Sequence, residues 1–275
     1  MCLAAVAPLA AAQGDAKRGA YLAKAGGCVE CHTEAREGAT PYAGGRALQT
    51  PFGTFYGPNI TPDPEAGIGR WSEADFIRAL RHGERPDGAS YYPAFPYPSF
   101  TKINDADLRD LWAYLRTLPP SKAASRPHQL GLLYRARWTL PLWKRLFFIP
   151  GPFIPDPQQS GAVNRGAYLV QALGHCSECH TPRNFLGGPK RGRFLAGGKV
   201  EDGKAAPNLT PTRLKQWNDA ELADVLSSGL LPDGDVLGET MAEVVRNTTS
   251  QLTKEDLQAL IAYLRSLPAL PSEPK

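Results

Sequence analysis

Hydrophobic residues recur at helical spacing in two stretches, residues 104–119 and 253–268. In each stretch the apolar positions fall at i, i+3, i+4 and i+7: Leu108, Leu111, Trp112 and Leu115 in the first, and Leu257, Leu260, Ile261 and Leu264 in the second. This spacing gives a helix one apolar face. We therefore expect two amphipathic helices that pack against the rest of the fold.

Polar residues mark where four helices begin. In each case a side chain that caps helix starts stands three residues before an acidic residue, a pattern that satisfies the free backbone amides of a first turn. The four pairs are Ser72 with Asp75, Asn104 with Asp107, Asn218 with Glu221, and Thr253 with Asp256. These patterns predict a mainly α fold.

The chain contains one long pattern twice. The segment RGAYLAKAGGCVECHT begins at Arg18, and RGAYLVQALGHCSECHT begins at Arg165. Each is followed by AGG, by PNIT or PNLT, by a Trp-led helix, by PDG, and by one of the two amphipathic helices. Two long copies predict two homologous domains, because a solenoid needs at least three short units. We place domain 1 at residues 14–120 and domain 2 at residues 161–270.

Residues 121–160 form the linker between the predicted domains. They are rich in Pro, Trp, Phe and Arg, and the stretch LLYRARWTLPLWKRLFF is too apolar to stay solvated. We expect this linker to pack and to join the two domains firmly. Peripheral contact with a membrane surface is the alternative role.

Charge and the N-terminal residues bear on partners and location. The net charge is only +4, and no run of Lys and Arg interleaved with aromatic residues indicates nucleic-acid binding. The start MCLAAVAPLAAAQGDA carries an apolar run followed by small residues, which is typical of the second half of a secretory signal. No other segment approaches the ~18 uncharged apolar residues of a membrane helix. We predict that residues 1–13 are a signal segment, that the protein is exported to the periplasm, and that the mature chain has no transmembrane segment.

Four of the five cysteines form two C-x-x-C pairs. Cys28 pairs with Cys31 and Cys176 with Cys179, and His32 and His180 follow directly. C-x-x-C-H is the attachment signature of c-type haem, in which the thiols bind the vinyl groups and the adjacent His ligates the iron. The 27 Gly and 26 Pro residues also suit an interior filled partly by a bulky cofactor. We predict two covalently bound haem c groups.

Three other uses of these cysteines fit less well. A zinc ribbon separates its pairs by about 15–20 residues, whereas well over a hundred separate these pairs. A thioredoxin-type dithiol belongs in a strand–helix–strand pattern, and here each pair follows a helix. Structural disulfides suit an exported protein. None of the three explains a His after both pairs.

The repeat resembles class I cytochrome c domains, and the chain as a whole resembles di-haem cytochromes. That family includes the cytochrome subunits of membrane-bound bacterial alcohol, aldehyde and gluconate dehydrogenases. The resemblance spans about Gly14 to Pro268 and rests on TPFGTFYGPNITPD, ALRHGERPDG, GHCSECHTPRN and GETMAEVV. It implies two tandem class I cytochrome c domains joined by a packed linker. It also implies a periplasmic dehydrogenase as electron donor, and quinone, an oxidase or another cytochrome as acceptor.

The distal ligand differs between the two copies. Class I domains usually complete the iron with a Met thioether, and this chain has only Met1, in the signal segment, and Met241. Trp71 and Trp217 lie 146 positions apart, and the same shift carries Phe95 to Met241. Members of the family usually have a Met where YPAFPY has Phe95. We predict that Met241 ligates the second iron and that the first iron has no Met ligand.

The sequence does not determine what occupies the sixth coordination position of the first iron. This position could be vacant, hold water, or take a nearby side chain, and the candidates are Tyr91, Tyr92, Tyr97, Lys102 and His82. We assign His128 to the linker, and His175, beside Cys176, to a part of the motif that does not reach the distal side.

Two functions follow from this pattern. The first is electron transfer, in which the chain is a carrier or the cytochrome subunit of a dehydrogenase complex rather than a self-standing enzyme. The alternative is a haem enzyme or a sensor of peroxide, nitric oxide or carbon monoxide that uses an open first iron. Peroxide cleavage benefits from an acid–base group over the iron, and the loop around Phe95 supplies only Pro, Phe and Tyr. A structural module with degenerate haem sites is a third, weaker reading because both motifs are intact.

Overall fold

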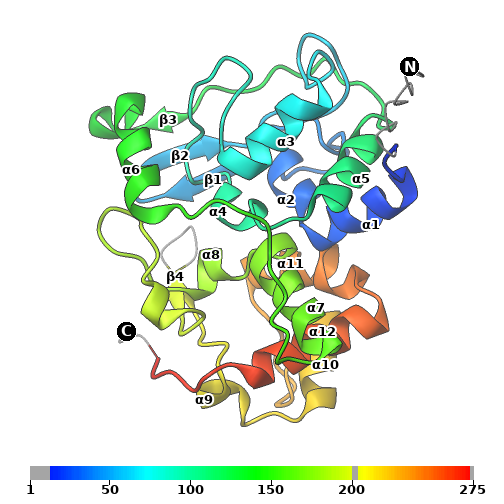
Figure 1. Ribbon diagram of the computed structural model, residues 1–275, viewed down its shortest axis with the longest axis vertical. Helices are drawn as coiled ribbons and strands as arrows, with labels where there is room; N and C mark the ends of the chain where they lie inside the picture. The colour runs from blue at the N-terminus through cyan, green and yellow to red at the C-terminus, as the bar shows by residue number, and fades with distance from the viewer. Residues whose placement is uncertain (1–12, 200–203, 273–275) are drawn as a thin grey trace, which may run out of the picture.

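The computed structural model describes residues 13–199 and 204–272, without the side chain of Glu239 (Figure 1). Residues 1–12 of the predicted signal segment lie outside the described residues. The chain forms two mainly helical domains, the first in the upper half of Figure 1 and the second in the lower half. Among the described residues, no helix has both the length and the apolar character needed to span a membrane.

Domain 1 is built around two crossing helices. Its elements are α1 (Ala16–Ala25), α2 (Cys28–His32), β1 (Ala47–Thr50), β2 (Gly53–Tyr56), α3 (Glu73–His82), α4 (Tyr97–Phe100) and α5 (Asp105–Leu115). The first helix, α1, crosses the closing helix α5 at Gly19. A Cβ atom at Gly19 would lie 1.9 Å from the Asp110 carbonyl oxygen, so the two backbones touch.

Domain 2 repeats this arrangement. Its elements are α7 (Gly161–Tyr168), η3 (Leu169–Leu173), α8 (Ser177–His180), η4 (Arg191–Arg193), β4 (Gly198–Lys199), β5 (Ala205–Ala206), α9 (Pro211–Leu214), α10 (Asp219–Ser228), α11 (Glu239–Asn247), η5 (Thr249–Gln251) and α12 (Lys254–Ser266). Here α7 crosses α12 at Gly166, whose added Cβ would lie 1.9 Å from the Ala259 carbonyl oxygen. Figure 1 shows the α1–α5 and α7–α12 pairs on the same side of the molecule.

The opening helices of the two domains differ by one residue. Ten positions separate Arg18 from Cys28, and eleven separate Arg165 from Cys176. The structure takes up the extra residue as a π-helical turn over η3, in which the Gly174 amide donates to the Leu169 carbonyl at 2.7 Å. A one-residue insertion inside a helix is commonly accommodated in this way.

All four predicted helix starts are confirmed. Ser72 and Asn218 cap α3 and α10 in full capping boxes, with Asp75 and Glu221 as the reciprocal acids. Asn104 caps α5 and Thr253 caps α12 through the third backbone amide of each helix. The apolar faces predicted for the closing helices are likewise inside: Leu108, Leu111, Leu115, Leu260, Ile261 and Leu264 are buried, and Trp112 and Leu257 are half-buried.

Only part of the linker packs as expected: one segment becomes a strand of domain 1 and Leu140 is buried, whereas Leu132, Leu133, Trp138, Leu142 and Leu146 stay exposed. Its elements are β3 (Gln129–Leu130), η1 (Leu132–Arg135), η2 (Arg137–Thr139) and α6 (Leu140–Phe147). The strand β3 pairs antiparallel with β2, giving the order β1-β2-β3. After α6 the chain crosses the face of the molecule to reach α7 (Figure 1).

Each domain caps the closing helix of the other. The Tyr21 hydroxyl donates to Asp256 at 2.6 Å and accepts from the Thr253 amide at 3.3 Å, at the start of α12. Reciprocally, the Tyr168 hydroxyl donates to Asp107 at 2.6 Å and accepts from the Asn104 amide at 3.3 Å, at the start of α5. This pair of matched contacts relates the two domains by an approximate two-fold axis.

Candidate functional site

The attachment motifs lie on two short helices that immediately follow the opening helices. Cys28, Cys31 and His32 all fall on α2, and Cys176, Cys179 and His180 fall on or just before α8. In a helical turn, residues three and four apart share one face. Each motif therefore presents two thiols and one imidazole on the same side, the arrangement that haem attachment needs.

Both motif histidines are fixed in one orientation by a proline carbonyl. His32 Nδ1 lies 2.7 Å from the Pro58 oxygen, and His180 Nδ1 lies 2.7 Å from the Pro207 oxygen. A carbonyl can only accept, so Nδ1 carries the proton and Nε2 keeps its lone pair for the iron. Burial lowers the pKa of both imidazoles, which keeps them neutral. The PNIT and PNLT segments of the repeat thus supply the ligand-orienting carbonyls, a role that the sequence alone did not reveal.

The first cysteine of each motif lies in surroundings unlike those of a redox dithiol. Burial raises the pKa of the Cys28 thiol to about 12 and that of Cys176 to about 11. Reactive thiols of the thioredoxin type have a lowered pKa. The environment therefore does not favour the dithiol alternative.

A large cavity opens beside the first motif. Its volume is about 1010 Å³, at the upper end of the roughly 300–1,000 Å³ usual for ligand sites. Cys28, Cys31 and His32 line one part of it. The apolar walls include Leu22, Ile68, Trp71, Phe76, Leu80, Ile103 and Leu111. An apolar cavity of this size beside two thiols and an oriented imidazole fits a haem ring.

Basic side chains meet at the same cavity. Arg85 from domain 1 and Arg126, Arg135 and Arg137 from the linker all line it. A haem carries two carboxylates, so guanidinium groups at the wall suit it. The linker thereby contributes directly to the first site, which the sequence did not indicate because these residues lie far from the motif along the chain.

Phe95 lines this cavity. The repeat predicts such a location, because Phe95 holds the position equivalent to Met241. Its ring packs edge-on against Tyr91, with centroids 5.3 Å apart, and against Phe100 at 5.8 Å. A phenyl ring offers no lone pair to a metal. The structure thus places an aromatic wall where the second domain has a thioether.

The side chains considered as substitute ligands separate into two groups. Tyr91 and Tyr92 line the cavity. The other three, His82, Tyr97 and Lys102, are not among its lining residues. His82 is exposed at the end of α3, Tyr97 is fully buried, and Lys102 Nζ donates to Gln171 at 3.0 Å.

Two histidines that the sequence assigned elsewhere also line the first cavity. His128 comes from the linker, and its Nδ1 accepts a hydrogen bond from the Tyr56 amide at 3.2 Å. His175 comes from domain 2, although it directly precedes the attachment cysteine of the second motif. Neither position could be foreseen from the repeat, because both depend on how linker and domains dock.

Met241 lies in the first turn of α11 and is half-buried. Its assignment to the second iron therefore still rests on the repeat, and it stays a prediction.

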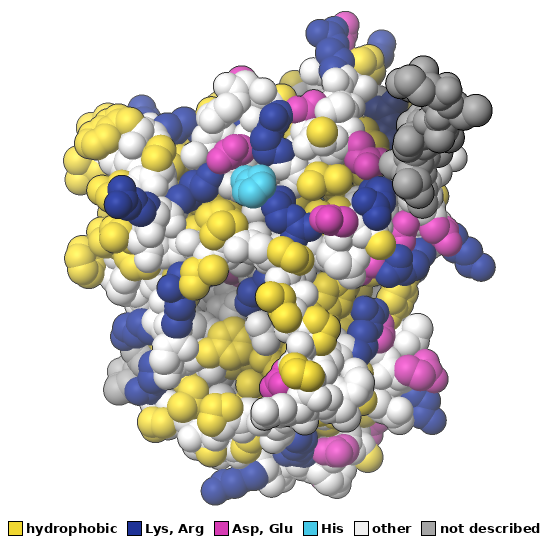
Figure 2. Space-filling model, in the orientation of Figure 1, with side chains coloured by type: hydrophobic (Ala, Val, Ile, Leu, Met, Phe, Trp, Pro, Cys, Tyr) yellow, Lys and Arg dark blue, Asp and Glu magenta, His cyan; other side chains and the backbone are white. Residues whose placement is uncertain are grey.

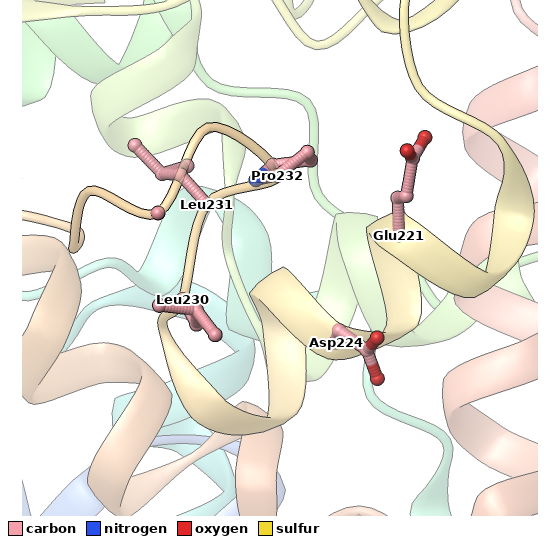
Figure 3. Close-up of a pocket in the computed structure, with 6 residues that line it drawn as sticks. Glu221, Asp224, Leu230, Leu231 and Pro232 are labelled. Atoms are coloured by element: carbon pink, nitrogen blue, oxygen red, sulfur yellow. The ribbon is translucent and has the colours of Figure 1, made fainter.

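A separate small pocket of about 210 Å³ lies between α10 and the following loop (Figure 3). It is lined by Glu221, Asp224, Leu230, Leu231, Pro232 and Gly234. None of these is a predicted site residue, and Glu221 already serves the α10 cap.

Each attachment motif contacts the opposite domain at the domain interface. Glu30, between the first pair of cysteines, accepts from Thr248 of domain 2 at 2.7 Å. Glu178, between the second pair, accepts from Ser99 of domain 1 at 3.0 Å. A half-buried ion pair between Arg46 and Glu243 at 2.7 Å supports the same contact. Docking of the domains therefore places both motifs at the interface.

Comparison with known proteins bears on the identity of these motifs. The family model described as "Cytochrome c" matches this chain twice, at residues 16–119 and 163–268. A protein of Cereibacter sphaeroides named "Diheme cytochrome c-type" is 46% identical over 266 residues, which cover 94% of this chain and 87% of that protein.

Other similar proteins are considerably longer than this chain. The cytochrome c subunit of the quinone alcohol dehydrogenase of Gluconobacter oxydans is 40% identical over 93% of this chain and 55% of its own length. One subunit of the nicotinate dehydrogenase of Pseudomonas putida is 45% identical over 93% of this chain, but the match spans only 21% of that protein. This chain thus corresponds to about half, or less, of these two relatives.

Proposed function

Because this chain belongs to the cytochrome c family and carries two covalently bound haem c groups, we propose that it transfers electrons in the periplasm. The donor is a dehydrogenase, and the acceptor is quinone, an oxidase or another cytochrome. The observation that carries the proposal is the location of both attachment motifs at the domain interface, where Glu30 and Glu178 each accept a hydrogen bond from a hydroxyl of the opposite domain. Two redox groups held at one interface suit a path through the molecule.

The residues divide into attachment, ligand and wall groups. Cys28, Cys31, Cys176 and Cys179 bind the haem vinyl groups, and His32, His180 and Met241 ligate iron. The iron of each bound haem supplies the one-electron oxidation and reduction. The protein orients each proximal imidazole through Pro58 or Pro207. It also shields the first ring from water with apolar side chains.

The names of the relatives suggest the class of donor. They include cytochrome subunits of alcohol, fructose and gluconate dehydrogenases. The test is to mix the oxidised protein with the catalytic subunit of each enzyme and its substrate, and to follow reduction of the haem absorption bands. Substrate-dependent reduction by at least one enzyme is expected. If none reduces a protein that ascorbate does reduce, the proposed donor class is wrong.

Binding of a small ligand at the first iron is a second candidate function, and Phe95 in the cavity favours it. Carbon monoxide added to the reduced protein should bind the first haem and leave the second unchanged. A spectrum unaffected by carbon monoxide would mean that a neighbour such as Tyr91 or Tyr92 closes the site. Turnover of peroxide by the purified protein would favour an enzyme over a carrier.

A third part of the proposal is peripheral contact of the linker with an anionic membrane surface. Large apolar side chains of η1, η2, α6 and the adjacent loop of domain 2 are half or more exposed. They are Leu132, Leu133, Trp138, Leu142, Leu146 and Phe185. Figure 2 shows hydrophobic side chains gathered over this part of the molecule, with Lys and Arg beside them. Residues 121–155 contain six Lys or Arg and no Asp or Glu, which suits an anionic surface.

Vesicle sedimentation tests this contact. The protein should sediment with phosphatidylglycerol vesicles and much less with phosphatidylcholine vesicles. Trp138→Ser should weaken that binding, whereas Val236→Ser, at an exposed apolar residue of domain 2, should not. Equal sedimentation of all three proteins with both lipids would contradict a specific role of the linker.

A further inference from the structure

His175 occupies a backbone position that glycine holds in the other domain. The residue before the first attachment cysteine is Gly27 in domain 1 and His175 in domain 2. Both are left-handed, with φ of 60° and 38°. A side chain costs energy in this region, which glycine enters freely. A residue held there against its preference points to a function for its side chain.

The imidazole of His175 projects from domain 2 towards domain 1. It lines the cavity of the first haem, together with Leu173 from the same turn. Its ring lies edge-on to Phe100, with centroids 5.5 Å apart. The imidazole also lies beside the backbone of Gly26, two residues before Cys28. Thus the residue directly before Cys176 touches the attachment loop of the first haem with its side chain.

The π-helical turn explains how His175 reaches this place. The extra residue of η3 advances the chain before Cys176, so that Gly174 and His175 leave the helix beside α1. The closeness of the two loops is visible at Gly26, where an added Cβ would lie 3.8 Å from the Leu173 carbonyl oxygen. Domain 1 has no matching insertion, and Gly27 at the matching position has no side chain that could make the reciprocal contact.

We propose that His175 is a positioning residue that connects the two haem groups. Its imidazole holds the first attachment loop at a fixed distance from the second. The connection runs from Cys176 through the His175 side chain to Gly26 and on to Cys28. This inference rests on the proposed electron transfer. The step that it serves moves one electron between the two irons, oxidising one and reducing the other, and no bond forms or breaks.

The substitution His175→Gly removes the bridge without straining the backbone. Glycine accepts the left-handed conformation, as Gly27 does in domain 1. The variant should therefore fold and attach both haems, which thermal unfolding and a haem stain verify. After rapid photoreduction of one haem, the rate of electron equilibration between the two should fall severalfold. The reduction potential of the first haem, read by spectroelectrochemistry, should shift as well.

Two further variants separate a bridge from a general structural effect. Asn tolerates left-handed backbone and can hydrogen-bond to Gly26, so His175→Asn should restore part of the rate. Lys17→Gln, at an exposed position of α1, should leave the rate and the potential unchanged.

The outcomes distinguish this inference from the proposed function. If the unaltered protein equilibrates electrons between its haems and His175→Gly does so equally fast with an unchanged potential, His175 is not the bridge. If the unaltered protein shows no equilibration at all, electron transfer through this chain is itself wrong.

Discussion

At the scale of single residues, the two domains differ at the position predicted for the distal iron ligand. Phe95 and Met241 hold equivalent places in the repeat, and Phe95 lines the first cavity. A thioether gives an iron its sixth ligand, whereas a phenyl ring only packs. If Met241 ligates the second iron as predicted, this one difference gives a closed second site and an open first site.

Phe95→Met should close the first site. The two side chains have similar bulk, so the cavity should accommodate the change at a cost below about 1.5 kcal/mol. We expect the reduced variant to lose carbon monoxide binding at the first haem and to show a higher potential there. Carbon monoxide difference spectra and spectroelectrochemistry measure both effects.

The matching experiment on the second domain is Met241→Leu. It should remove the only Met–iron charge-transfer band of the protein and open the second haem to carbon monoxide. Retention of that band would contradict the assignment of Met241. Carbon monoxide binding by Phe95→Met that matches the unaltered protein would show that residue 95 does not face the iron.

At the scale of elements, close crossing of the opening and closing helices fixes each domain. Gly166 touches α12 so closely that an added Cβ would lie 1.9 Å from a carbonyl oxygen. Gly19 has the same relation to α5. The matched glycine in both copies of RGAY thus serves contact between helices rather than a turn.

Gly166→Ala should separate α7 from α12 and lower the free energy of unfolding by about 1–3 kcal/mol, since overpacking outweighs the helix propensity gained. Gly161→Ala is the control, because it begins the same helix and a Cβ there meets nothing within 4 Å. The control should be neutral or slightly stabilising. Denaturant unfolding followed by circular dichroism gives both values, and equal stability of the two variants would contradict the close crossing.

Local elements could be predicted from the sequence because their causes are local. Asn104 and Thr253 mark the starts of α5 and α12 through bonds that span three residues. The position of His175 could not be predicted in this way. It depends on a π-helical turn and on docking of the domains, and Gly26 is its partner from the other domain. The same holds for His128, which reaches the first cavity only because β3 joins the sheet of domain 1.

At the scale of the whole molecule, charged and hydroxyl groups hold the domains in register. Tyr168 bonds to Asp107, which is fully buried and also pairs with Arg18. The mirror contact joins Tyr21 to Asp256, which pairs with Arg165. Because these groups span the interface, they fix the relative position of the two haem sites.

Tyr168→Phe should weaken the interface. It removes a hydrogen bond to a buried carboxylate, which typically contributes about 1.5–3 kcal/mol. Tyr134→Phe is the control, since Tyr134 is exposed on the linker. Thermal unfolding should shift to lower temperature for Tyr168→Phe alone. An unchanged transition would mean that the Tyr168 contact contributes nothing to docking.

The mirror contact should also make stability depend on pH in the acid range. Burial opposes ionisation of Asp256, but hydrogen bonds from Arg165 and Tyr21 outweigh it and lower the pKa of Asp256 below its usual value. A carboxylate with a lowered pKa stabilises the fold fully above its unfolded-state pKa of about 3.9, and this stabilisation is lost as the pH falls through the folded-state pKa.

Asp256→Asn should therefore be less stable than the unaltered protein at about pH 7, and the difference should shrink at about pH 3 and below. Glu65→Gln is the control, because Glu65 and its partner Arg70 are both largely exposed and 4.0 Å apart, where an ion pair contributes little. Denaturant unfolding at the two pH values measures the differences. If Asp256→Asn lost the same stability at both, the shape of the side chain rather than its charge would hold the domains together, and acid would not loosen the contact between the two haem sites.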